Sequence, residues 1–249
     1  MKFSLVVPTY QEAGGIERLI VMLDEVFRGA GLDGEIVVVD DNSPDGTGAI
    51  VDRLSDRYPV RCLHRPGKMG LSSGVIDGWR FARSDSEAVG AIDADFSHDA
   101  TIIPAMVAAL ENGYGLAVGS RYVKGGGIEN WPLKRKITSL VAIALAKPLF
   151  PLRDLTSGFF LVKRSALQGV ELDPIGFKIG LEVIAKAHYG RAKEIPYVFT
   201  DRVAGESKLN QNEILNYLRQ LRRIYALKLF NARSAEPVGA KSAGSREPL

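Results

Sequence analysis

Two aspartates separated by one residue are the pair in this chain best suited to hold a metal ion. Asp93 and Asp95 follow an apolar stretch, and side chains at positions i and i+2 of an extended chain point to the same side. Carboxylate oxygens are the ligands that Mg²⁺ and Mn²⁺ prefer, often together with substrate phosphates. Aspartate is equally common in polar turns that bind nothing. The pair therefore predicts either a divalent-metal site or an ordinary turn.

A second polar segment and a basic cluster could act on a phosphate-bearing substrate. The segment DDNSPDGT at 40–47 offers carboxylates that could accept hydrogen bonds from a nucleobase or a ribose, although turns and helix caps use the same residues. Charge-assisted hydrogen bonds to phosphate are typical of arginine and lysine clusters, and a solvated basic patch has the same composition. The cluster consists of Arg121, Lys124, Lys134, Arg135 and Lys136.

The elements that must position these residues alternate between strands and helices. Residues 16–27 have apolar side chains at helical spacing. Short apolar runs predict strands at 3–7, 35–39, 88–92, 115–119, 158–162 and 195–199. This alternation predicts an α/β fold, Rossmann-like, with a mainly parallel sheet flanked by helices. Sites in such sheets lie beyond the carboxyl ends of the strands, so we expect residues 9–12, 40–47 and 93–99 to meet in one crevice.

Two amphipathic stretches follow in the second half of the chain. Residues 134–150 join a basic cluster to a run without charges from Ile137 to Ala146, and residues 213–230 place leucines and isoleucines on one helical face beside arginines. Each could pack on the domain or on a second subunit, or lie at a membrane surface. The segment 231–249 is rich in Ala, Ser, Gly and Pro and is predicted to be a disordered tail.

Composition excludes several classes of protein. The 249 residues are 46% hydrophobic, which suits one sizeable α/β domain. Cys62 is the only cysteine, so a disulfide scaffold and a zinc ribbon are excluded. The net charge of +3 is too small to indicate nucleic-acid binding. The first residues enter a strand pattern without the apolar core of a signal peptide, and no run of about 18 apolar residues predicts a membrane span. We therefore expect a cytoplasmic protein.

Taken together, the polar segments resemble family 2 glycosyltransferases, and within them the polyprenyl-phosphate (dolichyl-phosphate) mannose synthase group, which has the GT-A fold. The likeness extends over residues 3–230 and implies one catalytic domain at 1–230. Its motifs are VVPTYQE at 6–12, VVVDDNSPDGT at 37–47, RPGKMGLSSG at 65–74, DADFSHD at 93–99, GSRYVKGG at 119–126, LTSGFFLVKR at 155–164, GFKIGLE at 176–182 and RVAGESKL at 202–209.

The resemblance implies a role for each matching position. The residues implied to bind a sugar nucleotide are Pro8, Tyr10, Glu12, Asp40, Asp41, Asp93, Ala94, Asp95, Lys178, Arg202 and Lys208. Those implied to bind the phosphate of the acceptor are Arg121, Arg135 and Ser139, with Asp95 and Arg121 as the catalytic pair. Asp93 and Asp95 would hold Mg²⁺ or Mn²⁺. Ser97, where family members often carry Gln, is a third candidate ligand, and a water molecule could replace its direct contact because serine is shorter.

The implied reaction transfers a hexose with inversion to a polyprenyl (dolichyl-type) phosphate and gives a lipid-linked β-monophosphoryl sugar. The likeness favours GDP-mannose as donor over a UDP-sugar such as UDP-glucose, which would serve in the same reaction class. The aspartate pair argues against a non-catalytic sugar-nucleotide-binding subunit, and the apolar run argues against a transferase for soluble glycans. The lipid acceptor implies attachment to the cytoplasmic face of a membrane through the amphipathic helices, through a partner subunit, or through both.

Overall fold

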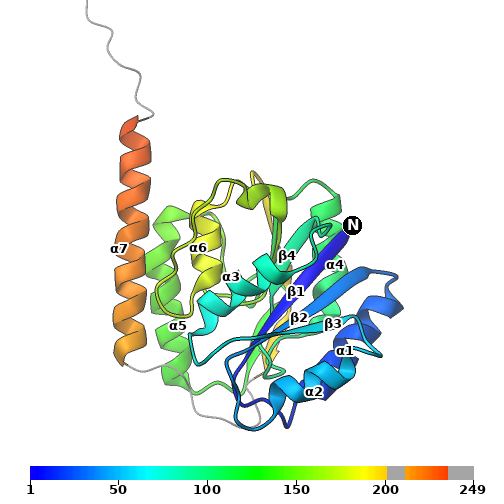
Figure 1. Cartoon of the computed structure of the whole chain (residues 1–249). Helices are drawn as coiled ribbons and strands as arrows, with labels where there is room; N and C mark the ends of the chain where they lie inside the picture. The colour runs from blue at the N-terminus through cyan, green and yellow to red at the C-terminus, as the bar shows by residue number, and fades with distance from the viewer. Residues whose placement is uncertain (201–210, 235–249) are drawn as a thin grey trace, which may run out of the picture.

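A computed structural model describes residues 1–200 and 211–234 of the chain (Figure 1). The first half contains β1 (Lys2–Thr9), α1 (Ile16–Gly29), β2 (Asp33–Asp40), α2 (Thr47–Leu54), β3 (Val60–His64), α3 (Leu71–Phe81), β4 (Ala88–Ala91), α4 (Ile103–Glu111) and β5 (Leu116–Ser120). The second half contains β6 (Gly127–Glu129), α5 (Leu133–Ala146), β7 (Phe160–Lys163), α6 (Ile179–Lys186), β8 (Ala192–Pro196), β9 (Val198–Thr200) and α7 (Gln211–Ser234).

A seven-stranded sheet organises the molecule, with strand order β3-β2-β1-β4-β7-β5-β8. All neighbours are parallel except β7, which runs antiparallel to both β4 and β5. The predicted α/β fold with a mainly parallel sheet is therefore confirmed, and the sheet is mixed because β7 returns between two parallel strands. Thr9 of β1 pairs with Asp40 of β2, so the ends of these strands and of β4 lie at one edge of the sheet.

Helices cover both faces of the sheet because its strands are apolar on both sides. Phe3, Leu5 and Val7 of β1 join one core with α1, α2 and α4, whereas Val6 joins the other core with α3, α5, α6 and α7. Strands buried on both faces read as continuous apolar runs. This burial explains why the strand predictions at 3–7, 35–39 and 88–92 fall within β1, β2 and β4 or one residue past their ends.

Two predicted elements differ from the structure in their boundaries. The run at 195–199 forms two strands, because Tyr197 separates β8, which pairs with β5, from β9, which pairs with β6 in a second small sheet. Helix α7 continues through Ser234, into the segment predicted to be a tail from residue 231. Residues 235–249 lie outside the described residues.

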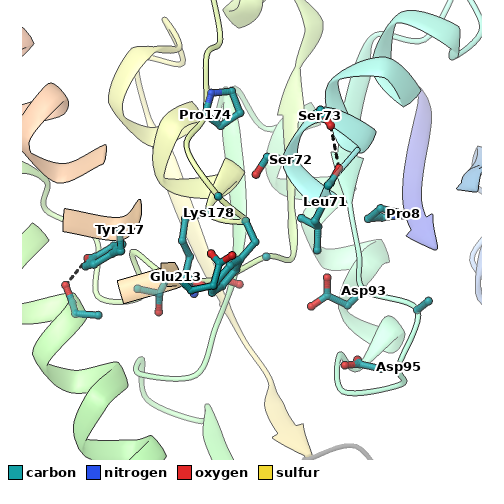
Figure 2. Close-up of a pocket in the computed structure, with 18 of the residues that line it drawn as sticks. Pro8, Leu71, Ser72, Ser73, Asp93, Asp95, Pro174, Lys178, Glu213 and Tyr217 are labelled. Atoms are coloured by element: carbon teal, nitrogen blue, oxygen red, sulfur yellow. Dashed lines mark hydrogen bonds between the residues drawn. The ribbon is translucent and has the colours of Figure 1, made fainter. Parts of the chain in front are cut away.

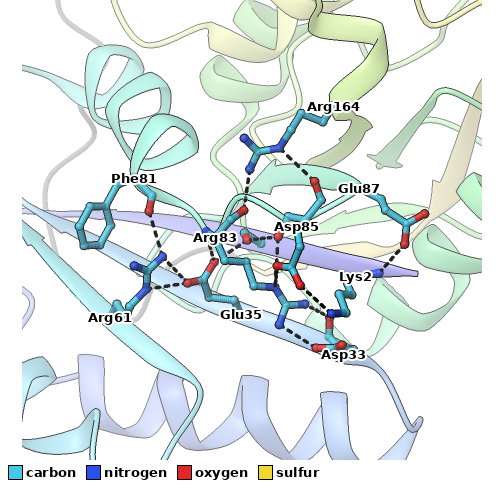
Figure 3. A network of polar contacts seen from close by, with 11 residues as sticks. Lys2, Asp33, Glu35, Arg61, Phe81, Arg83, Asp85, Glu87 and Arg164 are labelled. Atoms are coloured by element: carbon cyan, nitrogen blue, oxygen red, sulfur yellow. Dashed lines mark hydrogen bonds and ion pairs between the residues drawn. The ribbon is translucent and has the colours of Figure 1, made fainter.

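The edge of the sheet opposite the polar strand ends is held by a charged network (Figure 3). Buried Glu35 accepts hydrogen bonds from the Ser4 hydroxyl at 2.5 Å, from Arg61 Nε at 2.7 Å and from the Arg83 amide at 3.0 Å. Lys2 forms an ion pair with Asp85 at 2.6 Å. These contacts fix the starts of β1, β2 and β3 relative to one another, and the cleft lies at the other ends of these strands.

Candidate active site

A cleft of about 1000 Å³ lies beyond the carboxyl ends of β1, β2 and β4 and extends to the groove between α5 and α7 (Figure 2). The three segments predicted to meet in one crevice all contribute to it. Its walls include the predicted residues Pro8, Tyr10, Glu12, Asp41, Asp93, Ala94, Asp95, Arg121, Arg135, Ser139 and Lys178. Asp40 and Ser97 do not line the cleft. Arg202 and Lys208 lie outside the described residues.

The turn after β4 presents Asp93 and Asp95 on one wall of the cleft (Figure 2). Asp95 Oδ1 accepts the Ser97 amide at 3.1 Å and the Ser97 hydroxyl at 2.5 Å. Ser97 is 2% exposed, so its hydroxyl supports Asp95 from behind and does not face the cleft as a third metal ligand would. Two carboxylates at the mouth of a cleft suit a hard divalent cation such as Mg²⁺ or Mn²⁺.

Backbone geometry keeps this turn in place. Phe96 adopts a positive φ of 58°, which is uncommon for a bulky residue. Its ring lies 4.4 Å from the guanidinium of Arg18 and packs against Gly15, where a Cβ would come within 3.1 Å of the ring. Helix α1 thereby orients the turn that carries both aspartates.

His98 is buried behind the turn. Its Nδ1 accepts the Asp93 amide at 3.3 Å, and its ring contacts Phe159, Tyr197 and Phe199. Burial lowers the pKa of the imidazole, which is therefore held as a neutral hydrogen-bond acceptor. His98 is a structural part of the site.

Asp40, the last residue of β2, and Asp41, which follows it, both have partners within the protein. Asp40 accepts hydrogen bonds from Thr9 at 3.2 Å and from the Ser43 amide at 3.0 Å, and it is 2% exposed. Asp41 forms an ion pair with the buried Arg65 and lines the cleft. Asp40 thus closes the turn, and of the two only Asp41 reaches the cleft.

Arg121 is held by a carboxylate that the sequence did not single out. Asp154, fully buried, binds Arg121 Nε at 2.7 Å and Nη2 at 2.7 Å. Burial alone would lower the pKa of Arg121, but the hydrogen-bonded Asp154 outweighs it and raises that pKa. Burial likewise opposes ionisation of Asp154, and the contact with Arg121 prevails and lowers the pKa of that carboxyl. The pair is therefore ionised, and it fixes one cation in the wall of the cleft.

A second cation rests on aromatic rings beside the first. The guanidinium of Arg135 lies 4.3 Å from the Trp131 ring and 5.9 Å from the Phe199 ring. Arg121 lies 5.4 Å from the same Trp131 ring. Ser139, one helical turn after Arg135, accepts a hydrogen bond from Tyr122 at 2.9 Å. Arg121, Arg135 and Ser139 thus line one region of the cleft, as the resemblance implies.

Lys178 stands on the wall opposite the aspartates (Figure 2). Its ammonium donates to the Thr156 carbonyl at 3.4 Å. Burial, together with the positive charge of Arg121, lowers the pKa of Lys178 from 10.5 to about 8. A cation with a lowered pKa in a cleft is well placed to bind an anion, because the anion would restore its preference for the charged form.

An apolar groove continues the cleft between α5 and α7, which stand side by side (Figure 1). Tyr217 of α7 donates to the Ala142 carbonyl of α5 at 2.5 Å, and Tyr225 donates to the Leu145 carbonyl at 2.7 Å. Both helices expose large apolar side chains, and some of these line the cleft. Val141, Leu145, Ile214 and Leu218 line it. The exposed side chains that do not line the cleft are Leu133, Ile137, Leu140, Leu215, Leu227 and Leu229. No helix in the described part of the chain is both long and apolar enough to span a membrane.

Several residues of the site were not predicted from the sequence. Thr156, Trp131 and Ser72 line the cleft, and Asp154 supports it from below. Thr156 and Ser72 lie inside motifs that carry the resemblance, so their segments were identified although the residues were not. Asp154 and Trp131 have no signal in the sequence, because their importance comes only from contact with Arg121 and Arg135.

Comparisons with known proteins identify the family of the chain. Residues 4–170 match the model of Glycosyl transferase family 2. The chain is 43% identical over 228 residues to the dolichol-phosphate mannosyltransferase of Pyrococcus furiosus, covering 90% of this chain and 64% of that protein, so it spans less than two thirds of that relative's length. It is 34% identical over 242 residues to the dolichol-phosphate mannosyltransferase of Saccharomyces cerevisiae, covering 92% of this chain and 88% of that protein.

Solved structures share the fold at low sequence identity. Mannosyl-3-phosphoglycerate synthase from Rubrobacter xylanophilus superposes with a TM-score of 0.66 at 16% identity, over 98% of this chain and 79% of that one. A mannosyltransferase from Pyrobaculum calidifontis, in complex with GDP-Man and Mn²⁺, gives a TM-score of 0.56 at 20% identity, over 95% and 76%. The family match, the curated relatives and this fold place the chain in glycosyltransferase family 2, with a GT-A fold.

Proposed function

We propose that this glycosyltransferase transfers mannose from GDP-mannose to a polyprenyl phosphate. The observation that carries the proposal is the continuity of one cleft, which joins the aspartate pair, the cations and the apolar groove. The aspartate pair would serve the sugar nucleotide, and the cations would bind the phosphate of the acceptor. The apolar groove would hold the polyprenyl chain of the acceptor. The curated relatives are dolichol-phosphate mannosyltransferases, which supports mannose as the sugar.

Residues of this chain would hold the donor at its diphosphate. Asp93 and Asp95 fit Mg²⁺ or Mn²⁺, and the bound cation would neutralise the charge that develops on the leaving nucleoside diphosphate. Lys178 faces them across the cleft and would bind the diphosphate as a second cation. Tyr10 and Pro8, at the end of β1, line the part of the cleft expected to receive the nucleoside.

The acceptor would arrive already activated. A phosphate monoester has a second pKa of about 6 and is largely a dianion at neutral pH, so its oxygen needs no strong general base. Two anions must nevertheless approach each other, and Arg121 and Arg135 would offset their repulsion. Asp154 holds the Arg121 guanidinium by two hydrogen bonds, so this cation is oriented before the acceptor binds. Attack from the face opposite the diphosphate would invert the anomeric centre.

The apolar outer faces of α5 and α7 support docking on a membrane surface. Leu140 and Leu215 are exposed outside the cleft on helices that border the groove, and leucines of interfacial helices insert into the boundary between headgroups and acyl chains. The groove would then open where the lipid acceptor resides. A membrane-anchoring partner subunit could share the same faces.

The test is transfer of labelled hexose to a short polyprenyl phosphate, with GDP-mannose and UDP-glucose supplied in parallel, with and without EDTA. We expect an EDTA-sensitive lipid product from GDP-mannose and a loss of at least about 100-fold in kcat for Asp95→Ala. Product from UDP-glucose alone would keep the reaction class and change the sugar. Binding of a sugar nucleotide without any lipid product would contradict the proposal that polyprenyl phosphate is the acceptor.

A further inference from the structure

The amino end of α3 opens into the cleft between the donor wall and the α5–α7 groove. Gly70, at φ 96°, precedes the helix, and the Met69 and Gly70 amides donate to Asp41 at 3.1 and 3.2 Å. The next three residues, Leu71, Ser72 and Ser73, form the first turn of this 11-residue helix and line the cleft. First-turn amides have no acceptor within their own helix, so this turn offers hydrogen-bond donors to a ligand.

A buried hydroxyl lies beside these amides without a partner. Ser72 is 3% exposed, and its Oγ has no hydrogen bond to any residue that the structure describes. Figure 2 shows this side chain directed into the space between α3 and Lys178. Ser73 differs, because its hydroxyl donates to the Met69 carbonyl at 2.8 Å and accepts from Arg65 at 2.9 Å. Buried hydroxyls in folded proteins are almost always paired, so Ser72 is positioned for a ligand atom.

The charges around this turn favour a neutral ligand group over a phosphate. Arg65 is already paired with Asp41 and, at 3.2 Å, with Asp77. Arg80 contacts the other oxygen of Asp77 at 3.4 Å. Lys68 lies over the Tyr10 ring at 4.2 Å. Phosphate would instead be drawn to Arg121, Arg135 and Lys178, which belong to other parts of the wall.

We propose that Ser72 and the first-turn amides of α3 bind a hydroxyl group of the donor's hexose. The inference rests on the proposed function, which places the nucleotide at the end of β1 and the lipid between α5 and α7. Figure 2 shows Ser72 above the space that separates Pro8 and Asp93 from Lys178 and Tyr217, and the transferred sugar would sit in this space. A sugar hydroxyl both donates and accepts, as the serine hydroxyl does, and therefore suits a turn whose neighbouring charged side chains, Arg65 and Asp41, are already paired with each other.

The test compares binding of GDP and GDP-mannose to the wild type, Ser72→Ala and Ser73→Ala by titration calorimetry. We expect Ser72→Ala to leave GDP affinity unchanged and to weaken GDP-mannose binding roughly three- to tenfold, the usual effect of one lost hydrogen bond. Ser73→Ala is the matched control, because its hydroxyl bonds within the protein, and it should not alter the ratio of the two affinities. An unchanged ratio in Ser72→Ala would overturn the inference.

Deoxy analogues of GDP-mannose identify the hydroxyl that is bound. The analogue lacking that hydroxyl should bind the wild type more weakly than GDP-mannose does, yet bind Ser72→Ala as well as GDP-mannose does. Additive losses for every analogue would contradict the contact. If UDP-glucose binds and GDP-mannose does not, the proposed donor is wrong, and the same ratio is measured with UDP and UDP-glucose. If neither sugar nucleotide binds, the proposed function and this inference both fail.

Discussion

Replacing Lys178 by methionine should make the protein more stable and less active. Burial lowers the pKa of Lys178 from 10.5 to about 8, so the empty cleft disfavours its positive charge. A difference of 2.5 units at about 1.36 kcal/mol each corresponds to roughly 3.4 kcal/mol, and partial exposure to solvent reduces this to about 2 kcal/mol. Methionine keeps the apolar stem but loses the long hydrogen bond to Thr156, which costs about 0.5 kcal/mol.

The net gain of about 1.5 kcal/mol at pH 7 should raise the midpoint of thermal unfolding by roughly 3–6 °C. Because the folded-state pKa is lowered, protonated Lys178 destabilises the fold fully below pH 8, and this effect fades as pH rises from 8 towards 10.5. The gap between wild type and Lys178→Met should therefore shrink by more than half between pH 7 and pH 9.5. Lys124→Met, at an exposed position, is the control and should change stability by less than about 0.5 kcal/mol.

Calorimetric unfolding of the wild type, Lys178→Met and Lys124→Met at pH 7 and pH 9.5 measures the change in stability. The kcat/KM for the donor measures the change in activity. Loss of a charged contact to the diphosphate should lower kcat/KM for Lys178→Met by roughly 10- to 100-fold. A variant less stable than the wild type at pH 7, or a stability gap that does not depend on pH, would refute the reasoning. Increased stability with unchanged donor kinetics would show that the buried charge serves something other than the donor.

Two further predictions concern the buried ion pair and the outer helices. Asp154→Ala leaves Arg121 buried and unpaired, and it should cost about 3–5 kcal/mol of unfolding free energy in urea denaturation; a cost below about 1 kcal/mol would mean that Arg121 is held by other contacts. Leu140→Glu combined with Leu215→Glu should reduce co-sedimentation with anionic vesicles at least about tenfold, because both side chains are exposed on the apolar faces and neither lines the cleft. The unfolding midpoint should stay unchanged, and full retention on vesicles would exclude these faces as the membrane contact.

Some of the site could be predicted from the sequence because its causes are local. The β1, β2 and β4 strands are short apolar runs followed at once by polar turns, and parallel strands bring their carboxyl ends to one edge whatever else the chain does. Asp93 and Asp95 line the cleft because spacing alone sets them on the same turn. The apolar run after Arg135 likewise predicted the helix that borders the groove.

Only the tertiary structure decided which polar groups remain for ligands. Asp40 and Asp41 are neighbours in sequence, but Asp40 accepts a hydrogen bond from Thr9 at the end of β1, whereas Asp41 pairs with Arg65, which follows β3. The direction of β7 was equally hidden, since a buried strand has the same composition in either orientation.

The sequence determined the types of the residues in the site, whereas the tertiary structure determined their interaction partners. The sequence alone determined that this chain carries carboxylates, cations and an apolar helix in that order, within motifs that resemble those of family 2 glycosyltransferases. Folding determined that Asp154, 33 residues after Arg121, holds that cation, and that Ser72 is left unpaired while Ser73 is not. Hydrogen bonds and ion pairs depend on ångström-scale distances between distant segments, and one-dimensional spacing does not contain those distances.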